Sequence, residues 1–289
     1  MKIGTRLPPF SNQVGFDGYV AWLVSHGFEA VDTPPLTAEI ARTCSKHGIA
    51  IGTSDGRAPG LLAAEEAKRR QGLDSLKADL SAIAAHGGTT YFALLIPDDP
   101  AQGRARTFDI FREVYPEVVR HAESVGVQIA IEPWPGGAPH YGNLGCTPES
   151  LRRIFAHIPS PSLGVCFDPS HLVRIQVDYM RFLREFGERV KHVHLKDTEV
   201  IEEKLYESGI LGESFGRAYV CGEGWWRYTI PGEGEVDWVK VIRRLQDAGY
   251  DRVLSVELED HYYWSTQELQ KEGILRAKEY IEQLLTGRG

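Results

Sequence analysis

Four short apolar runs in the second half of the chain each end in a side chain that can ligate a metal or transfer a proton. The runs V-Q-I-A-I-E, L-G-V-C-F-D, V-K-H-V-H-L-K and V-L-S-V-E carry, in that order, Glu132, Asp168, His194 and Glu257. Successive side chains of a strand point to opposite faces, so one face of each run is apolar and the opposite face bears the acid or the histidine. If the runs are parallel strands of one closed sheet, these four side chains converge at its C-terminal rim, where the active sites of such barrels lie.

The run around His194 shows the pattern most clearly. Val193 and Leu195 point one way, while His192, His194 and Lys196 point the other. A face with two imidazoles and an ammonium is unusual for an ordinary core. We interpret His192 as a structural or supporting residue one layer deeper than His194. Lys196 is a candidate substrate contact, and the alternative is that it only neutralises the acids.

Three carboxylates and one imidazole form a mostly oxygen-rich ligand set. Such a set suits Mn²⁺, Co²⁺, Mg²⁺ or Fe²⁺, with Mn²⁺ as our first choice, and Zn²⁺ usually takes more nitrogen or sulfur. Carboxylates held this close together would repel one another without a cation. The sequence therefore predicts one divalent ion bound by these four residues.

The elements that would position the site alternate along the whole chain. Eight strand–helix units predict a single (β/α)8 TIM barrel over residues 1–289, since strands alternating with helices indicate a parallel sheet. The predicted strands are Lys2–Thr5, Ala30–Thr33, Ile49–Thr53, Tyr91–Ile96, Val127–Glu132, Leu163–Asp168, Val190–Lys196 and Arg252–Glu257. The predicted helices are Phe16–His26, Thr37–His47, Leu61–His86, Arg104–Val125, Pro148–His157, Asp178–Phe186, Val236–Ala248 and Thr266–Leu285.

One connection is far longer than the others. Thr198–Glu235 separates a strand from its helix, whereas connections of this kind usually have 2–6 residues. Long loops in compact domains are often lids or binding loops, so we expect this segment to close over the site. A contact between subunits of a homo-oligomer is the alternative, and the two roles are compatible.

Composition excludes several classes of function. The net charge of −8 argues against a nucleic-acid-binding protein, which usually carries a basic surface. The chain has no run of about 18 apolar residues, and its N-terminus has no signal-peptide pattern. Its four cysteines form no C-x-x-C pair, so we expect free thiols and a cytoplasmic protein with no membrane partner.

Several of these runs also carry a family resemblance. I-E-P-W-P-G-G, G-V-C-F-D-P-S-H, V-K-H-V-H-L-K-D and G-E-G-E-V-D-W followed by L-S-V-E-L-E-D resemble the sugar phosphate isomerase/epimerase family. That family belongs to the xylose isomerase-like barrel superfamily. The resemblance covers nearly all of the second half of the chain in order. The motifs together are specific for the superfamily and not for one substrate.

The resemblance also implies roles for individual residues. The metal ligands of the family match Glu132, Asp168, His194 and Glu257, and its acid/base pair matches Glu132 and Glu257. His171 matches a substrate-contacting histidine, and Arg217 and Arg227 compete for the place of a substrate-binding arginine. From their positions in the chain, Trp134 and His140 are further candidates to line the substrate site.

The implied activity is a metal-dependent isomerase or epimerase of a keto sugar. One glutamate would remove a proton beside the carbonyl, and the other would return a proton to an enediolate held on the metal. A lyase that dehydrates inososes or eliminates from 3-keto-glycosides would use the same residues and is the alternative. An apurinic endonuclease would need more histidine ligands and a basic face, and a non-catalytic sugar-binding barrel would not need the glutamate pair.

Overall fold

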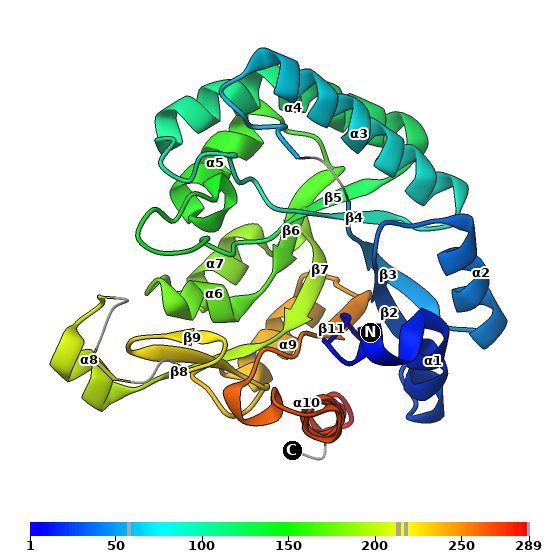
Figure 1. The fold of residues 1–289 in the computed structure, drawn as a ribbon, viewed down its shortest axis with the longest axis vertical. Coiled ribbons are helices and arrows are strands. Elements are labelled where there is room, and N and C mark those ends of the chain that lie inside the picture. Colours follow the sequence, from blue (N-terminus) through cyan, green and yellow to red (C-terminus); the bar gives the residue numbers. More distant parts are fainter. Residues whose placement is uncertain (57–58, 212–214, 217–218, 288–289) are drawn as a thin grey trace. The chain divides into compact units, whose positions relative to one another are not determined.

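A computed structural model describes residues 1–56, 59–211, 215–216 and 219–287. Eight parallel strands form a closed barrel in the order β1-β11-β7-β6-β5-β4-β3-β2, which confirms the predicted (β/α)8 fold (Figure 1). The barrel strands are β1 (Lys2–Thr5), β2 (Ala30–Thr33), β3 (Ala50–Ser54), β4 (Thr90–Ala93), β5 (Gln128–Ile131), β6 (Leu163–Phe167), β7 (Val190–Leu195) and β11 (Val253–Val256).

Ten α-helices lie among the described residues. They are α1 (Ser11–Ser25), α2 (Ala38–His47), α3 (Glu66–Ala85), α4 (Arg104–Val125), α5 (Pro148–His157), α6 (Pro169–Arg174), α7 (Tyr179–Phe186), α8 (Glu202–Ser208), α9 (Trp238–Asp247) and α10 (Gln267–Leu285). Side-chain caps fix several of their starts: Thr147 accepts from the amide of Ser150, and Asp237 accepts from that of Lys240. Each cap satisfies an amide that has no partner within the helix.

Several helices differ from the sequence prediction. α1 begins at Ser11 instead of Phe16, and α3 begins at Glu66 instead of Leu61. The predicted helix Arg104–Val125 is confirmed as α4, which continues through Pro116. The short helix α6, which begins directly after Asp168, was not predicted because six residues are too few to show a helical period.

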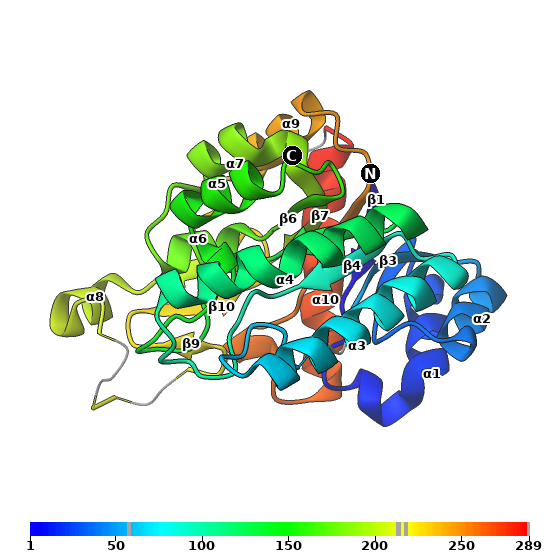
Figure 2. The same ribbon diagram turned by 90° about the horizontal axis from the view of Figure 1, so that it is seen from above.

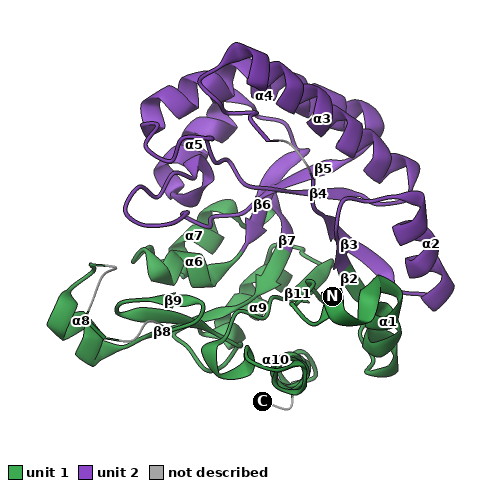
Figure 3. Cartoon of the chain, viewed as in Figure 1, with its two compact units in different colours: residues 1–31, 168–188, 193–289 green, residues 32–167, 189–192 purple. Residues whose placement is uncertain are grey.

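The chain divides into two compact units, which are described separately (Figure 3). The unit of residues 32–167 and 189–192 contains β3 to β6 and the helices α2 to α5. In both views α3 and α4 run side by side (Figures 1 and 2). Its largest fully buried side chains include those of Tyr115, Phe111, Phe167, Leu76 and Leu80.

The unit of residues 1–31, 168–188 and 193–289 contains β1, β11 and the helices α1 and α6 to α10. Its largest fully buried side chains include those of Trp238, Tyr19, Phe10 and Phe182. The unit also holds the long Thr198–Glu235 connection. That connection has structure of its own, which its composition did not reveal.

A second, three-stranded antiparallel sheet forms within the long connection. It comprises β8 (Asp197–Val200), β9 (Gly222–Glu223) and β10 (Trp226–Thr229), with β10 in the centre. The side chains of Trp225, Trp226 and Tyr228 are buried and form an apolar cluster. This part of the segment is therefore a packed wall of three strands, and removing it would cost stability.

Asp197 forms hydrogen bonds with residues at both ends of the long connection. Its carboxylate accepts hydrogen bonds from the amides of Thr198 (2.8 Å), Val236 (3.0 Å) and Gly232 (3.2 Å) and from the indole of Trp238 (3.0 Å). Burial raises the pKa of this carboxyl to about 6, and the hydrogen bonds act in the opposite direction.

Two simpler expectations concern the chain as a whole. Among the described residues, no helix is long and apolar enough to cross a membrane. The four cysteines, Cys44, Cys146, Cys166 and Cys221, are free thiols, as predicted.

Candidate metal centre

Asp168 is positioned by its own helix start. It caps α6, and its Oδ1 accepts hydrogen bonds from the amide (2.9 Å) and the hydroxyl (2.6 Å) of Ser170. In the described part of the chain, its buried Oδ2 accepts no hydrogen bond, although the ammonium of Lys196 lies 3.3 Å away. One oxygen is thus held and the other is directed toward the candidate site.

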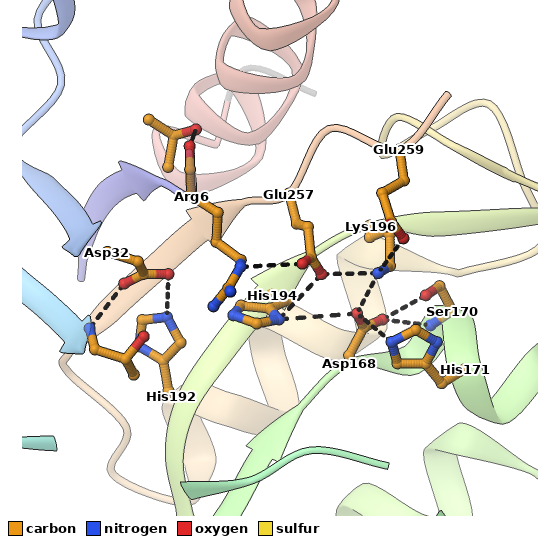
Figure 4. A network of polar contacts seen from close by, with 12 residues as sticks. Arg6, Asp32, Asp168, Ser170, His171, His192, His194, Lys196, Glu257 and Glu259 are labelled. Atoms are coloured by element: carbon orange, nitrogen blue, oxygen red, sulfur yellow. Dashed lines mark hydrogen bonds and ion pairs between the residues drawn. The ribbon is translucent and has the colours of Figure 1, made fainter. Parts of the chain in front are cut away.

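His194 and Glu257 are brought together by parallel pairing of β7 with β11. Ser255 is the register partner of His194, so Glu257 lies just beyond it at the strand end. His194 Nδ1 lies 3.2 Å from Glu257 Oε2 and 4.0 Å from Asp168 Oδ2 (Figure 4). Asp168, His194 and Glu257 each offer a ligand atom within 4.8 Å of the others. Three of the four predicted ligands therefore converge within one unit.

Two cations hold the acids of this cluster. Lys196, only 1% exposed, places Nζ 2.7 Å from Glu257 Oε2, 2.9 Å from Glu259 Oε2 and 3.3 Å from Asp168 Oδ2. Arg6 Nε lies 3.1 Å from the other oxygen of Glu257. Burial alone would raise the pKa of Glu257, but Lys196, His194 and Arg6 together hold that pKa well below its usual range.

His171 lies on α6 between the cluster and the wall of the long connection. Its Nε2 is 3.3 Å from Asp168 Oδ2, and its Nδ1 is 2.7 Å from the hydroxyl of Tyr228. Arg174, one turn further along α6, donates to the same hydroxyl at 3.2 Å. Burial raises the pKa of Tyr228 above its usual value, so this hydroxyl keeps its proton.

Glu132, the fourth predicted ligand, lies in the other unit. It directly follows β5, is 4% exposed, and its amide donates to the carbonyl of Ala93 at 3.0 Å. Asn143 fixes the loop behind it by donating to the carbonyls of Glu132 (3.1 Å) and Trp134 (2.6 Å). On this loop Trp134 is half-buried and His140 is exposed.

Asp32 and His192 form a buried pair in the same unit as Glu132. His192 Nε2 is 3.0 Å from Asp32 Oδ2, and Asp32 Oδ1 accepts from the amide of Thr53 at 2.8 Å. A Cβ on Gly52 would stand 2.2 Å from Asp32 Oδ1 and 3.3 Å from the His192 ring. Gly52 therefore makes room for this pair, which fits the supporting role predicted for His192.

The Gly52→Ala variant is expected to unfold more easily, because its methyl group would displace the buried Asp32 carboxylate. Overpacking of this kind costs about 1–3 kcal/mol, measurable as a lower urea midpoint. Gly137→Ala is the matched control, since a Cβ there meets nothing within 4 Å. Equal midpoints for the two variants would contradict this packing argument.

Of the two candidate substrate-binding arginines in the long connection, the structure describes one. Arg217 lies outside the described residues. Arg227 is buried, and its guanidinium pairs with Glu199 (2.5 Å) and Asp260 (3.3 Å) while stacking over Tyr262. Its observed contacts therefore support the wall formed by β8 to β10.

Sequence reasoning missed Arg6, Arg174, Tyr228 and Glu259 as members of this cluster. Glu259 shares its strand parity with Glu257, and Tyr228 shares its parity with Trp226, so an alternation pattern could have pointed to both. Arg6 directly follows β1, at the same end of its strand as the ligands. Arg174 could not be placed without the unpredicted helix α6.

The donor chemistry of the cluster fits a divalent metal ion. Asp168 and Glu257 offer carboxylate oxygens and His194 an imidazole nitrogen, which is a set that Mn²⁺, Co²⁺ and Fe²⁺ accept. The buried Oδ2 of Asp168 is directed toward this set, as a ligand atom would be.

Comparison with known proteins identifies the family. The family model of the xylose isomerase-like TIM barrel matches residues 11–283, so the chain belongs to this family. This confirms the resemblance seen in the second half of the sequence.

Individual relatives are more distant. The inosose dehydratase of Clostridium perfringens (strain ATCC 13124) is 32% identical over 120 residues, which are 42% of this chain and 38% of that enzyme. The matches thus span about two fifths to one half of the length of the curated relatives. Among solved structures, a D-tagatose 3-epimerase-like protein has a TM-score of 0.71 at 19% identity, covering 99% of this chain and 97% of its own. The 3-keto-D-glucoside 4-epimerase from E. coli has a TM-score of 0.72 at 15% identity, covering 98% and 99%. The TM-scores of these two structures show a shared fold.

Proposed function

We propose that the chain is a divalent-metal-dependent isomerase or epimerase of a keto sugar. The observation that carries this proposal is the convergence of Asp168, His194 and Glu257, with ligand atoms within 4.8 Å of one another. Membership of the xylose isomerase-like family and the epimerases among the similar folds point in the same direction.

In this proposal Glu132 completes the ligand set. Its strand, β5, is followed in barrel order by β6, β7 and β11, whose ends carry Asp168, His194 and Glu257. Parallel strands of a barrel end at one rim, so the four donors belong to one face of the fold. Mn²⁺ is our first choice for the ion because the set is rich in oxygen and holds one imidazole.

The charges of the cluster are consistent with a divalent ion. Lys196 and Arg6 lie beside the carboxylates of Asp168, Glu257 and Glu259, and the proposal adds the carboxylate of Glu132, so four negative charges stand against two positive ones. Two negative charges are left over, which one divalent ion would neutralise. When bound, the ion would supply Lewis acidity toward the substrate carbonyl.

The two glutamates carry the proton transfers. The lowered pKa of Glu257 keeps it a carboxylate, which is the form that can accept a proton from the carbon beside the carbonyl. Arg6 and Lys196 each hold one of its oxygens and so fix its direction. Glu132 would return a proton from the opposite face, which inverts that carbon, and return to the neighbouring carbon would isomerise the sugar.

Further substrate contacts are proposed on the same face. His171 and Lys196 lie within 3.3 Å of Asp168 Oδ2 and are our first candidates to bind sugar oxygens. Trp134 and His140 follow Glu132 on its loop and are candidates for the sugar's C–H faces and hydroxyls. The sequence candidates Arg217 and Arg227 remain candidates of lower rank.

A lyase acting on inososes or 3-keto-glycosides is the second candidate. The match of 120 residues to an inosose dehydratase favours it, and one of the same two glutamates would remove the proton. In this reaction a β-substituent leaves in place of the second proton transfer.

Product analysis by NMR distinguishes these activities. The purified protein with added Mn²⁺, Co²⁺ or Mg²⁺ is incubated with a panel of ketoses, inososes and 3-keto-glycosides. Metal-dependent formation of an epimer or isomer supports the proposal. Loss of water or cleavage of a glycoside favours the lyase and overturns the isomerase. No turnover of any panel member with any ion counts against both.

A further inference from the structure

The hydroxyl of Tyr228 lies between two buried nitrogen groups of α6. His171 Nδ1 is 2.7 Å from it and Arg174 Nη1 is 3.2 Å from it. The rings of His171 and Tyr228 meet edge to face, with centroids 5.2 Å apart. All three side chains are buried. The donors and acceptors of Arg174, Tyr228 and His171 determine the direction of both hydrogen bonds.

Arg174 determines the direction of its hydrogen bond with Tyr228. A guanidinium has only donors, so Arg174 donates and the oxygen of Tyr228 accepts. The hydroxyl proton of Tyr228 then needs an acceptor, because a buried donor is normally satisfied. His171 Nδ1, at 2.7 Å, is such an acceptor only when it carries no proton. This places the proton of the neutral imidazole on Nε2.

The other side of the ring is consistent with a proton on Nε2. His171 Nε2 lies 3.3 Å from Asp168 Oδ2. An N–H at this position is attracted to the carboxylate, whereas a lone pair would be repelled by it. The hydrogen bond at Nδ1 thus selects the tautomer, and the surroundings of Nε2 agree with it.

We infer that Tyr228 and Arg174 fix His171 as the neutral tautomer protonated on Nε2, which makes His171 a hydrogen-bond donor on the metal-site side. Tyr228 acts through His171 and is thus a positioning residue. A histidine in this state can bind a substrate oxygen that accepts a hydrogen bond, and it does not serve as a base from Nε2. This consequence for turnover rests on the proposed function, whereas the tautomer itself does not.

The long connection has a definite role in this arrangement. Tyr228 belongs to β10, the central strand of the wall sheet, and Lys196 lies 4.7 Å from the centre of its ring. Arg174 stacks 4.3 Å above the Trp226 ring, and its Nη2 lies 3.3 Å from Glu223. The sheet therefore carries Tyr228 and contacts Arg174, the two residues that orient His171. Figure 4 shows His171 beside Asp168. This is a supporting role that a loop closing over the site would not provide.

The tautomer can be tested by nitrogen-15 NMR of the full-length protein with Mg²⁺, a diamagnetic ion. The His171→Gln variant identifies the His171 signals by their loss. We expect Nδ1 to resonate in the unprotonated range and Nε2 in the protonated range. The reverse pattern, or two protonated nitrogens, would overturn the inference whether or not the protein turns over a sugar.

The role of Tyr228 is tested by Tyr228→Phe, with Tyr206→Phe as the matched control because Tyr206 is 88% exposed on α8. Tyr228→Phe is expected to mix the two tautomers of His171 and to lower kcat about 10–100-fold, as for other residues that support a metal site. The control should keep the wild-type spectrum and rate. A His171 spectrum unchanged by Tyr228→Phe in a folded variant would refute the positioning role. If no sugar is turned over by the wild type, the spectra still decide the inference, and the proposed function fails separately.

Discussion

The Glu257→Gln variant is expected to turn over the sugar substrate about 10²–10⁴-fold more slowly than the wild type, which is the usual effect of removing a general base. This loss corresponds to about 3–5 kcal/mol of transition-state stabilisation. Glutamine keeps the size of the side chain and one oxygen for Arg6 but cannot accept the proton. Glu132→Gln is expected to show a loss of the same order, since the proposed reaction needs both glutamates.

Two measurements separate proton transfer from other effects of these variants. Glu259→Gln removes a neighbouring carboxylate that also pairs with Lys196, and its loss should stay below about 10-fold if charge alone is at stake. Substrate turned over in D₂O should acquire deuterium at the carbon beside the carbonyl. Products that retain all of their original hydrogen would indicate a hydride shift, and the two-glutamate mechanism would be abandoned.

The sequence predicted the barrel and its rim because both depend on local patterns. Strand alternation around Glu132, Asp168, His194 and Glu257 is readable within six residues, and the repeated strand–helix rhythm specifies the fold class. Parallel barrel strands are buried on both faces, so small or apolar side chains fill their inward positions until the polar rim is reached.

The supporting contacts could not be predicted because they join residues far apart in the chain. Tyr228 reaches His171 only because β10 pairs with β8, an antiparallel register set by contacts such as Thr229 with Asp197. Arg6 reaches Glu257 across 251 residues of sequence through the pairing of β1 with β11. The long connection is rich in glycine and aromatic residues, and this composition fits a mobile loop and a packed sheet equally well.

The His194→Ala variant is expected to lose most of its affinity for a divalent ion. The wild type should bind one Mn²⁺ or Co²⁺ per chain, measurable by calorimetry and by elemental analysis of protein purified without chelator. Even residues outside the ligand set typically contribute 10–100-fold to affinity, so removing a ligand should weaken binding by about 100-fold or more. Asp168→Asn should act similarly, because it replaces a buried anionic ligand with a neutral amide.

Thermal stability gives a second measurement of the same event. An ion present at 100 times its Kd stabilises the folded state by about 2.7 kcal/mol, so Mn²⁺ should raise the Tm of the wild type. His194→Ala should lose this rise, whereas His157→Ala, which alters an exposed histidine of α5, should keep it.

Lys196 and Arg6 pair with Glu257, and a bound ion would add positive charge beside them. Glu259 then matters, because it offers Lys196 a carboxylate outside the ligand set. A wild type that binds no ion and gains no stability after Mn²⁺ or Co²⁺ is added would show that these two cations already satisfy the acids and that the cluster is not a metal centre.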